Sequence, residues 1–460
     1  MPRAPRPTGT LRTLMASLLR WIAEAAIRIY YPRRTVEGRE HLPPPGAAIY
    51  VANHPNGLLD PLVLRVTLDR AARFLAKSTL WANPFGRLAM DAFACLPVYR
   101  MQDVAVNGRG ETVARNEETF ARCRAELAAG ADLALYPEGT SHSDPQLKPL
   151  KTGAARIALG AAAEAAEEKR SRLPVLVPIG SHYESPALFR SAVHLVVGAP
   201  IALGPYLPQF SADPRHAIDA LTDDIRARLD GLILQAETRE LLAGIARVAS
   251  WTASAPDDDA PERHHARTRE LLAAYAKLRA SDPARVERLT EAVRDYARLL
   301  ERMGVRDPWA LETPRISAGP IALGLGRLAL MIPFAVWGVV TSWLPYRLTG
   351  IAARKATKDD DVLSTMKMIG GAAFLVAAWL IEAVVIGLCF GAGAGAGALL
   401  LAPPAGYAAL RFSERLREVV EALRHVSVGW RARGETVRRL TERRQRLAAD
   451  VAQALRQTEP

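Results

Sequence analysis

Between about residues 35 and 205, short apolar runs alternate with segments of helical periodicity. The apolar runs predict buried strands, and they lie at 47–53, 131–137, 173–180 and 193–198. Helical patterns lie between them at 61–71, 111–130 and 152–170. Alternation of this kind predicts an α/β fold, in which helices sandwich a mostly parallel sheet.

Residues 11–31 place apolar side chains at steps of three and four. This spacing predicts an amphipathic helix, which Pro32 ends. Two interpretations remain open for it. The helix either packs on its own domain, or lies in a membrane interface with its arginines among the phosphates and with Trp21 and Tyr30 at the acyl boundary.

After residue 315 the pattern becomes almost continuously apolar. Residues 328–346 contain no charge, and residues 369–410 contain only Glu382. The first stretch is long enough to cross about 30 Å of hydrocarbon as a helix, and the second is long enough for a helical hairpin. These stretches predict membrane embedding, because continuous apolar runs of this length exceed what the surface helix of a globular protein tolerates.

Basic residues concentrate between these two stretches, at 347–368, and in the tail after residue 410. Since such flanks favour the cytoplasmic side, we expect an integral membrane protein whose catalytic domain faces the cytoplasm. Each apolar stretch would then either enter the membrane and return or lie partly in one leaflet. Pro333 permits a return in the first stretch, and 391–398 or Pro403–Pro404 could form a bend in the second.

The remaining segments are helical and charged. Residues 212–310 show helical periods interrupted by an acidic run at 255–262, which predicts a loop. The basic tail is expected to form either solvated helices or helices on an anionic membrane surface. The expected organisation is an N-terminal helix (1–34), an α/β domain (35–210), a helical extension (211–315), membrane-embedded segments (316–410) and a basic helical tail (411–460).

Composition narrows the class of protein. The chain has 460 residues, 49% of them hydrophobic, and its mean hydropathy is +0.01, which excludes a disordered or collagen-like protein. Its net charge of +12 comes without a nucleic-acid motif, so we expect membrane lipids and no nucleic acid among its partners. Its three cysteines fit neither a disulfide framework nor a zinc site, and its basic N-terminus lacks the apolar core of a cleavable signal.

The segment VANHPNGLLDPLVL, residues 51–64, carries the sharpest chemical signal. His54 leaves a predicted strand, and Asp60 follows a short turn at the start of a predicted helix. His54 can deprotonate an alcohol, while Asp60 can hold its ring in the correct tautomer. Taken alone, the pair is equally typical of a loop histidine and a helix-capping aspartate.

Three further blocks follow predicted strands. Arg100 ends the block CLPVYR, where a guanidinium suits a phosphate. A second block gathers donors around an anion, and it comprises Glu138, Gly139, Thr140, Ser141 and His142. Lys148 and Lys151 precede a helix whose N-terminus favours negative charge, and Pro178 comes after a buried strand. Ser141 does not stand in a Gly-x-Ser-x-Gly motif, which argues against a serine hydrolase.

The order and spacing of these blocks resemble the glycerolipid acyltransferase family over about residues 35–205. That family joins an acyl thioester to a hydroxyl of a glycerol phosphate. Here five residues separate His54 from Asp60, and EGTSH stands where the family usually has Glu-Gly-Thr-Arg. Both features look like the branch with fungal glycerol-3-phosphate and dihydroxyacetone-phosphate acyltransferases, which also carries C-terminal membrane segments.

The resemblance implies a role for each block. His54 acts as the base and Asp60 orients it, while backbone N–H groups around Gly139 meet the developing oxyanion. Arg100 ranks first for phosphate binding, and His142, Lys148 or Lys151 can supply the charge of the missing arginine. The donor is acyl-CoA or acyl carrier protein, used as co-substrate, with no metal and no other cofactor.

The acceptor remains open between glycerol 3-phosphate and 1-acylglycerol 3-phosphate, as does the oligomeric state. The rival interpretation is a non-enzymatic membrane scaffold that binds lipid on a degenerate acyltransferase fold. Intact residues at His54, Asp60, Arg100 and Glu138 count against it.

Overall fold

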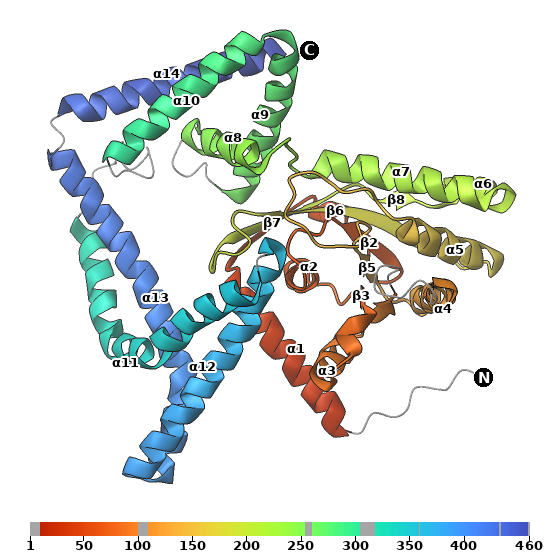
Figure 1. Ribbon diagram of the computed structural model, residues 1–460, viewed down its shortest axis with the longest axis horizontal. Coiled ribbons are helices and arrows are strands. Elements are labelled where there is room, and N and C mark those ends of the chain that lie inside the picture. The colour runs from red at the N-terminus through yellow and green to blue at the C-terminus, as the bar shows by residue number, and fades with distance from the viewer. Residues whose placement is uncertain are drawn as a thin grey trace. The chain divides into compact units, whose positions relative to one another are not determined.

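The computed structural model describes residues 10–99, 109–253, 260–303, 318–357, 359–431 and 434–458 (Figure 1). The chain divides into two compact units. The first comprises Met1–Arg239 with Asp359–Thr365, and the second comprises Glu240–Lys358 with Met366–Pro460. The predicted acidic loop at 255–262 lies mostly outside the described residues.

The first unit is built on an eight-stranded sheet of order β1-β7-β6-β2-β5-β3-β4, with β8 paired to β6. The strands are β1 (Arg33–Glu37), β2 (Ala48–Ala52), β3 (Arg73–Lys77), β4 (Leu96–Val98), β5 (Leu133–Leu135), β6 (Val175–Tyr183), β7 (Ala192–Val197) and β8 (Ile201–Ala202). Only the β6–β7 and β6–β8 pairs are antiparallel among the described strands. The predicted α/β fold with a mostly parallel sheet is confirmed.

Strands β1, β3 and β8 lie where the sequence pattern indicated none. β1 reads RRTVE and β3 reads RFLAK, so both carry charged residues where a buried strand would be apolar. β1 lies at an edge of the sheet, where one side of a strand stays accessible to solvent. β3 buries only Phe74. A search for apolar runs therefore passes over both.

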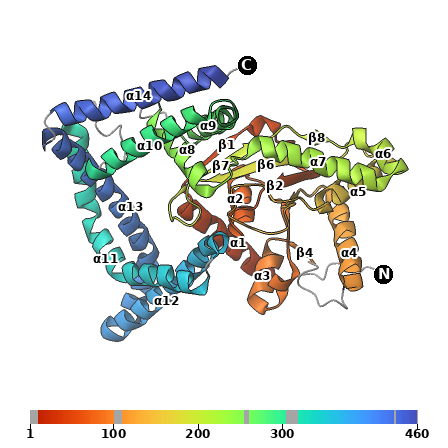
Figure 2. The same cartoon turned by 45° about the horizontal axis from the view of Figure 1, so that its top comes forward.

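Helices cover both faces of this sheet (Figures 1 and 2). They are α1 (Thr10–Tyr30), α2 (Leu59–Leu68), α3 (Pro84–Ala92), α4 (Arg109–Ala128), α5 (Gly153–Glu167), α6 (Leu207–Ala212) and α7 (Pro214–Leu232). One core cluster joins α4, α5 and α7 to Ile49, Leu133 and Leu176 of the sheet. On the other side α1 contacts α2 and α3. The central strand β2 is consequently buried along its whole length.

The N-terminal helix α1 uses its two faces differently. Ile27 and the following Tyr31 are fully buried, and Arg65 of α2 donates to Glu24 at 2.8 Å. An outward stripe of large apolar side chains stays exposed, and it comprises Leu14, Met15, Leu18, Trp21, Ile22 and Ile29. Tyr30 is only 4% exposed, so the prediction that it reaches an acyl boundary is wrong. It lies on the inward face with Ile27, to one side of the exposed stripe.

The second unit contains a charged helical bundle. Its helices are α8 (Arg239–Trp251), α9 (Pro261–Ser281), α10 (Pro283–Met303) and α14 (Gly434–Thr458). Trp251, Tyr296, Leu300, Leu440 and Leu447 form its apolar core, with the Trp251 and Tyr296 rings edge to face at 5.2 Å. The helical character predicted for residues 212–310 and for the tail is confirmed over the described residues.

Three long helices complete the chain: α11 (Ala318–Ala356), α12 (Asp360–Phe390) and α13 (Ala392–Arg431). Within the described residues, three segments are long and apolar enough to cross a membrane, namely Leu325–Ala356, Val362–Phe390 and Ala392–Arg417. The bend predicted at 391–398 is confirmed, because Gly391 separates α12 from α13 with φ of +92°.

α11 is continuous through Pro333, so the proline does not end the helix. Pro403 and Pro404 likewise lie inside α13. In membrane helices, packing against neighbouring helices compensates for the backbone hydrogen bond that proline cannot form. At Gly338 such packing is so close that an added Cβ would lie 2.0 Å from the Ala405 carbonyl oxygen. The single charge of the second apolar stretch, Glu382, accepts a hydrogen bond from Trp337 Nε1.

Candidate active site

The candidate site forms where the parallel strands end. β2 lies between β5 and β6, and it pairs with both in parallel, so their carboxyl ends meet at one edge of the sheet. His54 follows β2, Glu138 follows β5 and Tyr183 is the last residue of β6. Topology thus brings together residues that are far apart in the sequence.

The structure joins His54 and Asp60 directly. His54 Nδ1 lies 2.8 Å from Asp60 Oδ2, and the Asn56 amide donates to the same oxygen at 2.8 Å. Gly57 has φ of +51°, a left-handed conformation that favours glycine, and it turns the chain back toward α2. Asp60 lies in the first turn of α2, is 2% exposed, and accepts a further hydrogen bond from the Tyr183 hydroxyl at 2.5 Å.

The His54 ring is held in an orientation that suits a general base. A carboxylate only accepts hydrogen bonds, so Nδ1 is assigned as the protonated nitrogen and Nε2 carries the lone pair. The ring stacks on Tyr136 with centroids 4.2 Å apart and planes 16° from parallel. Within the described part of the chain, no side chain or backbone group bonds to Nε2, and 16% of the His54 side chain is exposed.

Glu138 connects the two halves of the site and is only 3% exposed. One of its oxygens accepts from the His54 amide at 2.9 Å. The other accepts from the Lys148 amide at 3.0 Å and from His142 Nε2. The His142 amide in turn donates to the His54 carbonyl oxygen at 3.1 Å. Glu138 and His142 therefore build the scaffold of the site, while their predicted contact with substrate stays a prediction.

The turn after β5 is closely packed. Gly139 has φ of +71°, and an added Cβ would lie 2.9 Å from carbons of the Lys151 side chain. The Gly139 amide donates to the Tyr136 carbonyl oxygen at 3.0 Å, and the Thr140 hydroxyl lies 3.3 Å from the Ser141 carbonyl oxygen. Because the Gly139 and His142 amides are both engaged, an oxyanion would need donors other than these two.

The predicted phosphate-binding cations are less tightly placed. Lys148 Nζ lies 3.3 Å from Asp144, with the two side chains 37% and 56% exposed. Lys151 is exposed, its amide donates to the Pro137 carbonyl oxygen at 2.8 Å, and its side chain lies over Gly139. Arg100 lies outside the described residues.

Three tyrosines at the site escaped the sequence analysis. Burial raises the pKa of Tyr183, Tyr136 and Tyr31, and the charge of Asp60 raises each of them further. The Tyr31 hydroxyl accepts from Asn56 Nδ2 at 2.7 Å and donates to the Pro186 carbonyl oxygen at 2.6 Å. Tyr183 lies three residues after the strand predicted at 173–180. The residues around it in the sequence do not indicate that its partner is Asp60.

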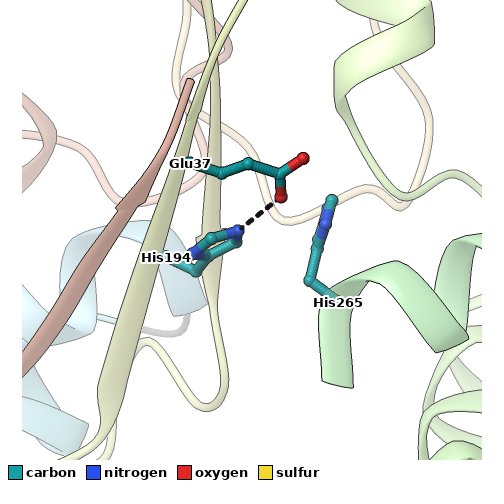
Figure 3. Close-up of side chains that lie close together, drawn as sticks. All are labelled: Glu37, His194 and His265. Atoms are coloured by element: carbon teal, nitrogen blue, oxygen red, sulfur yellow. Dashed lines mark ion pairs between the residues drawn. The ribbon is translucent and has the colours of Figure 1, made fainter. Parts of the chain in front are cut away.

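Two other histidines serve the sheet away from this site. Figure 3 shows the Glu37 carboxylate of β1 facing His194 of β7, at 3.4 Å from Nε2. His194 Nδ1 lies 2.8 Å from the Thr35 hydroxyl, and His182 Nε2 lies 3.0 Å from the Leu232 carbonyl oxygen. These contacts tie both histidines to neighbouring elements of the fold and not to the candidate site.

The family model described as Acyltransferase matches residues 33–180, from the start of β1 into β6. Residues 33–180 are an acyltransferase domain. The matched range contains His54, Asp60, Glu138 and both candidate lysines, whereas Tyr183 lies just beyond it. The family resemblance inferred from the four blocks is thereby confirmed.

Curated relatives extend the match beyond the acyltransferase domain. An uncharacterized acyltransferase from Schizosaccharomyces pombe is 26% identical over 62% of this chain and 54% of its own length. The glycerol-3-phosphate O-acyltransferase 2 of Saccharomyces cerevisiae is 27% identical over 49% of this chain and 30% of its own. The chloroplastic 1-acyl-sn-glycerol-3-phosphate acyltransferase of Arabidopsis thaliana is 31% identical over 29% and 35%.

This chain thus spans about half of the length of the first relative and about a third of the other two. Among solved structures, the 1-acyl-sn-glycerophosphate acyltransferase PlsC of Thermotoga maritima is 17% identical, with a TM-score of 0.31 over 48% of this chain and 83% of that chain.

Proposed function

We propose that this protein is a membrane-bound O-acyltransferase, which moves a fatty acyl group from a thioester to a hydroxyl of a glycerol phosphate. The observation that carries the proposal is the His54–Asp60 pair, at 2.8 Å, inside the acyltransferase domain. The donor is acyl-CoA or acyl carrier protein. The reaction requires neither a metal nor a further cofactor.

The mechanism follows from the geometry of the pair. His54 Nε2 takes the proton of the acceptor hydroxyl while the hydroxyl oxygen attacks the thioester carbonyl carbon. The Asp60 carboxylate offsets the positive charge that develops on the imidazole. The carbon–sulfur bond then breaks, the electron pair leaves with sulfur, and the proton on His54 passes to the thiolate. An ester and a free thiol result, without an acyl-enzyme, since a thioester is already activated.

For the acceptor we favour glycerol 3-phosphate over 1-acylglycerol 3-phosphate. The relatives that match the larger share of this chain are fungal, and one is named a glycerol-3-phosphate O-acyltransferase. The relative named for 1-acylglycerol 3-phosphate matches 29% of this chain. Both acceptors present a phosphate, for which Arg100, Lys148 and Lys151 are the proposed ligands.

We place the acyltransferase domain on the cytoplasmic side. Positive charge at the end of α11 supports this orientation, through Arg354 and Lys355 in its last turn and Lys358 after it. The residues that follow, Asp359–Thr365, belong to the same compact unit as the acyltransferase domain. Cysteines introduced singly at positions 350–365 should react with an impermeant reagent only after the membrane is opened. Labelling of intact cells or sealed vesicles from the outer side would contradict this orientation.

The activity is tested with membranes that contain the full chain, radiolabelled acyl-CoA and each acceptor in turn, with products separated by thin-layer chromatography. We expect labelled 1-acylglycerol 3-phosphate from glycerol 3-phosphate. His54→Ala should lower the rate by about 10²–10⁴-fold with unchanged membrane association.

The matched control is His216→Ala, which removes an exposed histidine on α7 and should keep the wild-type rate. Transfer by His54→Ala at the wild-type rate would refute the assignment of the base. No transfer to either acceptor by the wild type would instead support the scaffold interpretation.

A further inference from the structure

Asp60 receives a hydrogen bond that the pairing with His54 does not require. The Tyr183 hydroxyl donates to Asp60 Oδ1 at 2.5 Å, while His54 and the Asn56 amide both use Oδ2. We propose that Tyr183 is a positioning residue for His54, which fixes the Asp60 carboxylate so that Oδ2 stays aimed at Nδ1. This inference deepens the proposed function and rests on it for its kinetic consequence.

The geometry explains why the second oxygen matters. A carboxylate bonded only through Oδ2 can rotate about its Cβ–Cγ bond, because that torsion is broad. Such rotation would carry Oδ2 away from the imidazole and from the Asn56 amide together. With Tyr183 on Oδ1, three donors on both sides of the carboxylate define one orientation. Asp60 is 2% exposed, so water has little access to replace a lost donor.

The Tyr183 hydroxyl remains a donor over the working range of pH. Burial raises the pKa of Tyr183, and the negative charge of Asp60 raises it further. The titratable groups that face Asp60 are His54 from the β2–α2 turn, Tyr183 from β6, Tyr31 after α1 and Tyr136 after β5. Burial also raises the pKa of Tyr31 and Tyr136, so these two phenols likewise stay protonated near neutral pH.

The phenol ring of Tyr183 is itself held in place. It packs edge to face on Tyr31 with centroids 5.4 Å apart. Tyr31 reaches the same turn, since its hydroxyl accepts from Asn56 Nδ2 at 2.7 Å. The two tyrosines therefore hold both ends of the Asn56–Asp60 segment, and Tyr183 is the one that touches the carboxylate.

The main variant is Tyr183→Phe, which keeps the ring and removes the hydroxyl. A lost hydrogen bond to a charged group predicts a fall in kcat of roughly ten- to hundredfold, with KM for donor and acceptor changed by less than about threefold. The free Oδ1 leaves more negative charge on Asp60 to stabilise protonated His54. The acidic limb of the pH–rate profile should therefore move to higher pH, by about half a unit or more.

The matched control is Tyr50→Phe, since the hydroxyl of this fully buried tyrosine lies 3.5 Å from Asp132 Oδ2, away from the catalytic turn. It should unfold at a lower temperature, as Tyr183→Phe does, yet keep the wild-type kcat and pH profile. A purely structural role for Tyr183 would give both variants the same behaviour. A wild-type kcat, or an unshifted acidic limb with reduced kcat, in Tyr183→Phe would overturn the proposal.

A measurement without turnover separates this inference from the proposed function. In the detergent-solubilised full chain with labelled histidines, the resonance of His54 is assigned as the one that His54→Ala lacks. Its titration midpoint should rise in Tyr183→Phe and stay unchanged in Tyr50→Phe. The absence of that rise refutes the positioning role, whereas the absence of acyl transfer by the wild type refutes only the proposed function.

Discussion

The two halves of the candidate site differ in how firmly their polar groups are held. In the turn from His54 to Asp60, the imidazole, the carboxylate and the Asn56 side-chain NH₂ group have hydrogen-bond partners at 2.5–2.8 Å. In the segment that carries Lys148 and Lys151, both ammonium groups are accessible to water, and Lys148 Nζ pairs with an exposed aspartate. The half expected to move the proton is preorganised, and the half expected to bind phosphate is open.

This difference has a physical reason. A general base must lie within a few tenths of an ångström of the position from which it can take the proton. When its residues are aligned before substrate binds, the reaction barrier does not include the cost of aligning them. A long lysine side chain gains from remaining hydrated until a phosphate replaces the water, since burial of an unpaired ammonium is unfavourable. The ordered hydrogen bonds therefore lie around the proposed base, and the accessible positive charge lies where a phosphate can enter.

Glu138 accepts hydrogen bonds from both halves of the site, so its replacement should have the largest effect on stability and activity. In Glu138→Gln one oxygen becomes an NH₂ group, which cannot accept from the Lys148 amide or from the His54 amide. Each buried donor left without an acceptor costs about 1–3 kcal/mol. We expect the full chain to lose about 2–4 kcal/mol of stability and kcat to fall by roughly ten- to hundredfold, because the His54 backbone loses its anchor.

The matched control is Glu117→Gln, which breaks the exposed ion pair of Glu117 with Arg156. Surface pairs of this kind contribute about 0–1 kcal/mol, so stability and kcat should both stay near wild type. Thermal unfolding and initial rates check both variants. Equal stability of the two variants would show that the hydrogen bonds of Glu138 do not hold the halves together.

The sequence predicted the parts of this site that depend on local order. His54 and Asp60 are linked by one short turn, and Gly57 signals that turn. Their contact could therefore be anticipated from the spacing alone. Four strands were anticipated because their apolar runs are continuous, while β1 and β3 were missed because charged residues interrupt them.

Contacts that depend on sheet order could not be anticipated. Tyr183 meets Asp60 because β6 is the neighbour of β2, although more than a hundred residues separate them. The inward position of Tyr30 and the continuity of α11 through Pro333 depend on packing partners supplied by other helices. Amphipathic spacing and a proline are local signals, and neither one identifies those partners.

Lys151→Met tests whether the open half of the site binds the acceptor phosphate. The side chain keeps its length over Gly139 but loses the charge that would meet a phosphate. One charge-assisted hydrogen bond is worth about 1.5–3 kcal/mol, so KM for glycerol 3-phosphate should rise by about tenfold or more. The value of kcat should change by less than about threefold, because the His54–Asp60 pair is untouched.

Steady-state kinetics at several salt concentrations provide the measurement, with Lys277→Met on the exposed surface of α9 as the control. The wild-type KM should also rise with salt more steeply than that of Lys151→Met, since a charge pair is screened. A variant with lower kcat and an unchanged KM would place Lys151 in the chemical step instead of in acceptor binding.

The smallest expected effect has the opposite sign. Asp144 lies 3.3 Å from Lys148 Nζ, so its carboxylate competes with an incoming phosphate for that ammonium group. Asp144→Asn removes that competition and keeps the shape. The pair is 37% and 56% exposed, and an interaction in water at this distance amounts to about 1 kcal/mol before screening. KM for the acceptor should therefore fall by about two- to threefold, with kcat unchanged.

A double-mutant cycle decides whether this gain passes through Lys148. Lys148→Met alone should raise KM by a similar factor, and Asp144→Asn should have no further effect in that background, since the two residues are in contact. Equal gains in both backgrounds would assign the effect to the general field. A rise of KM in Asp144→Asn would show that Asp144 positions Lys148 for binding, so that the open half would be as preorganised as the half around His54.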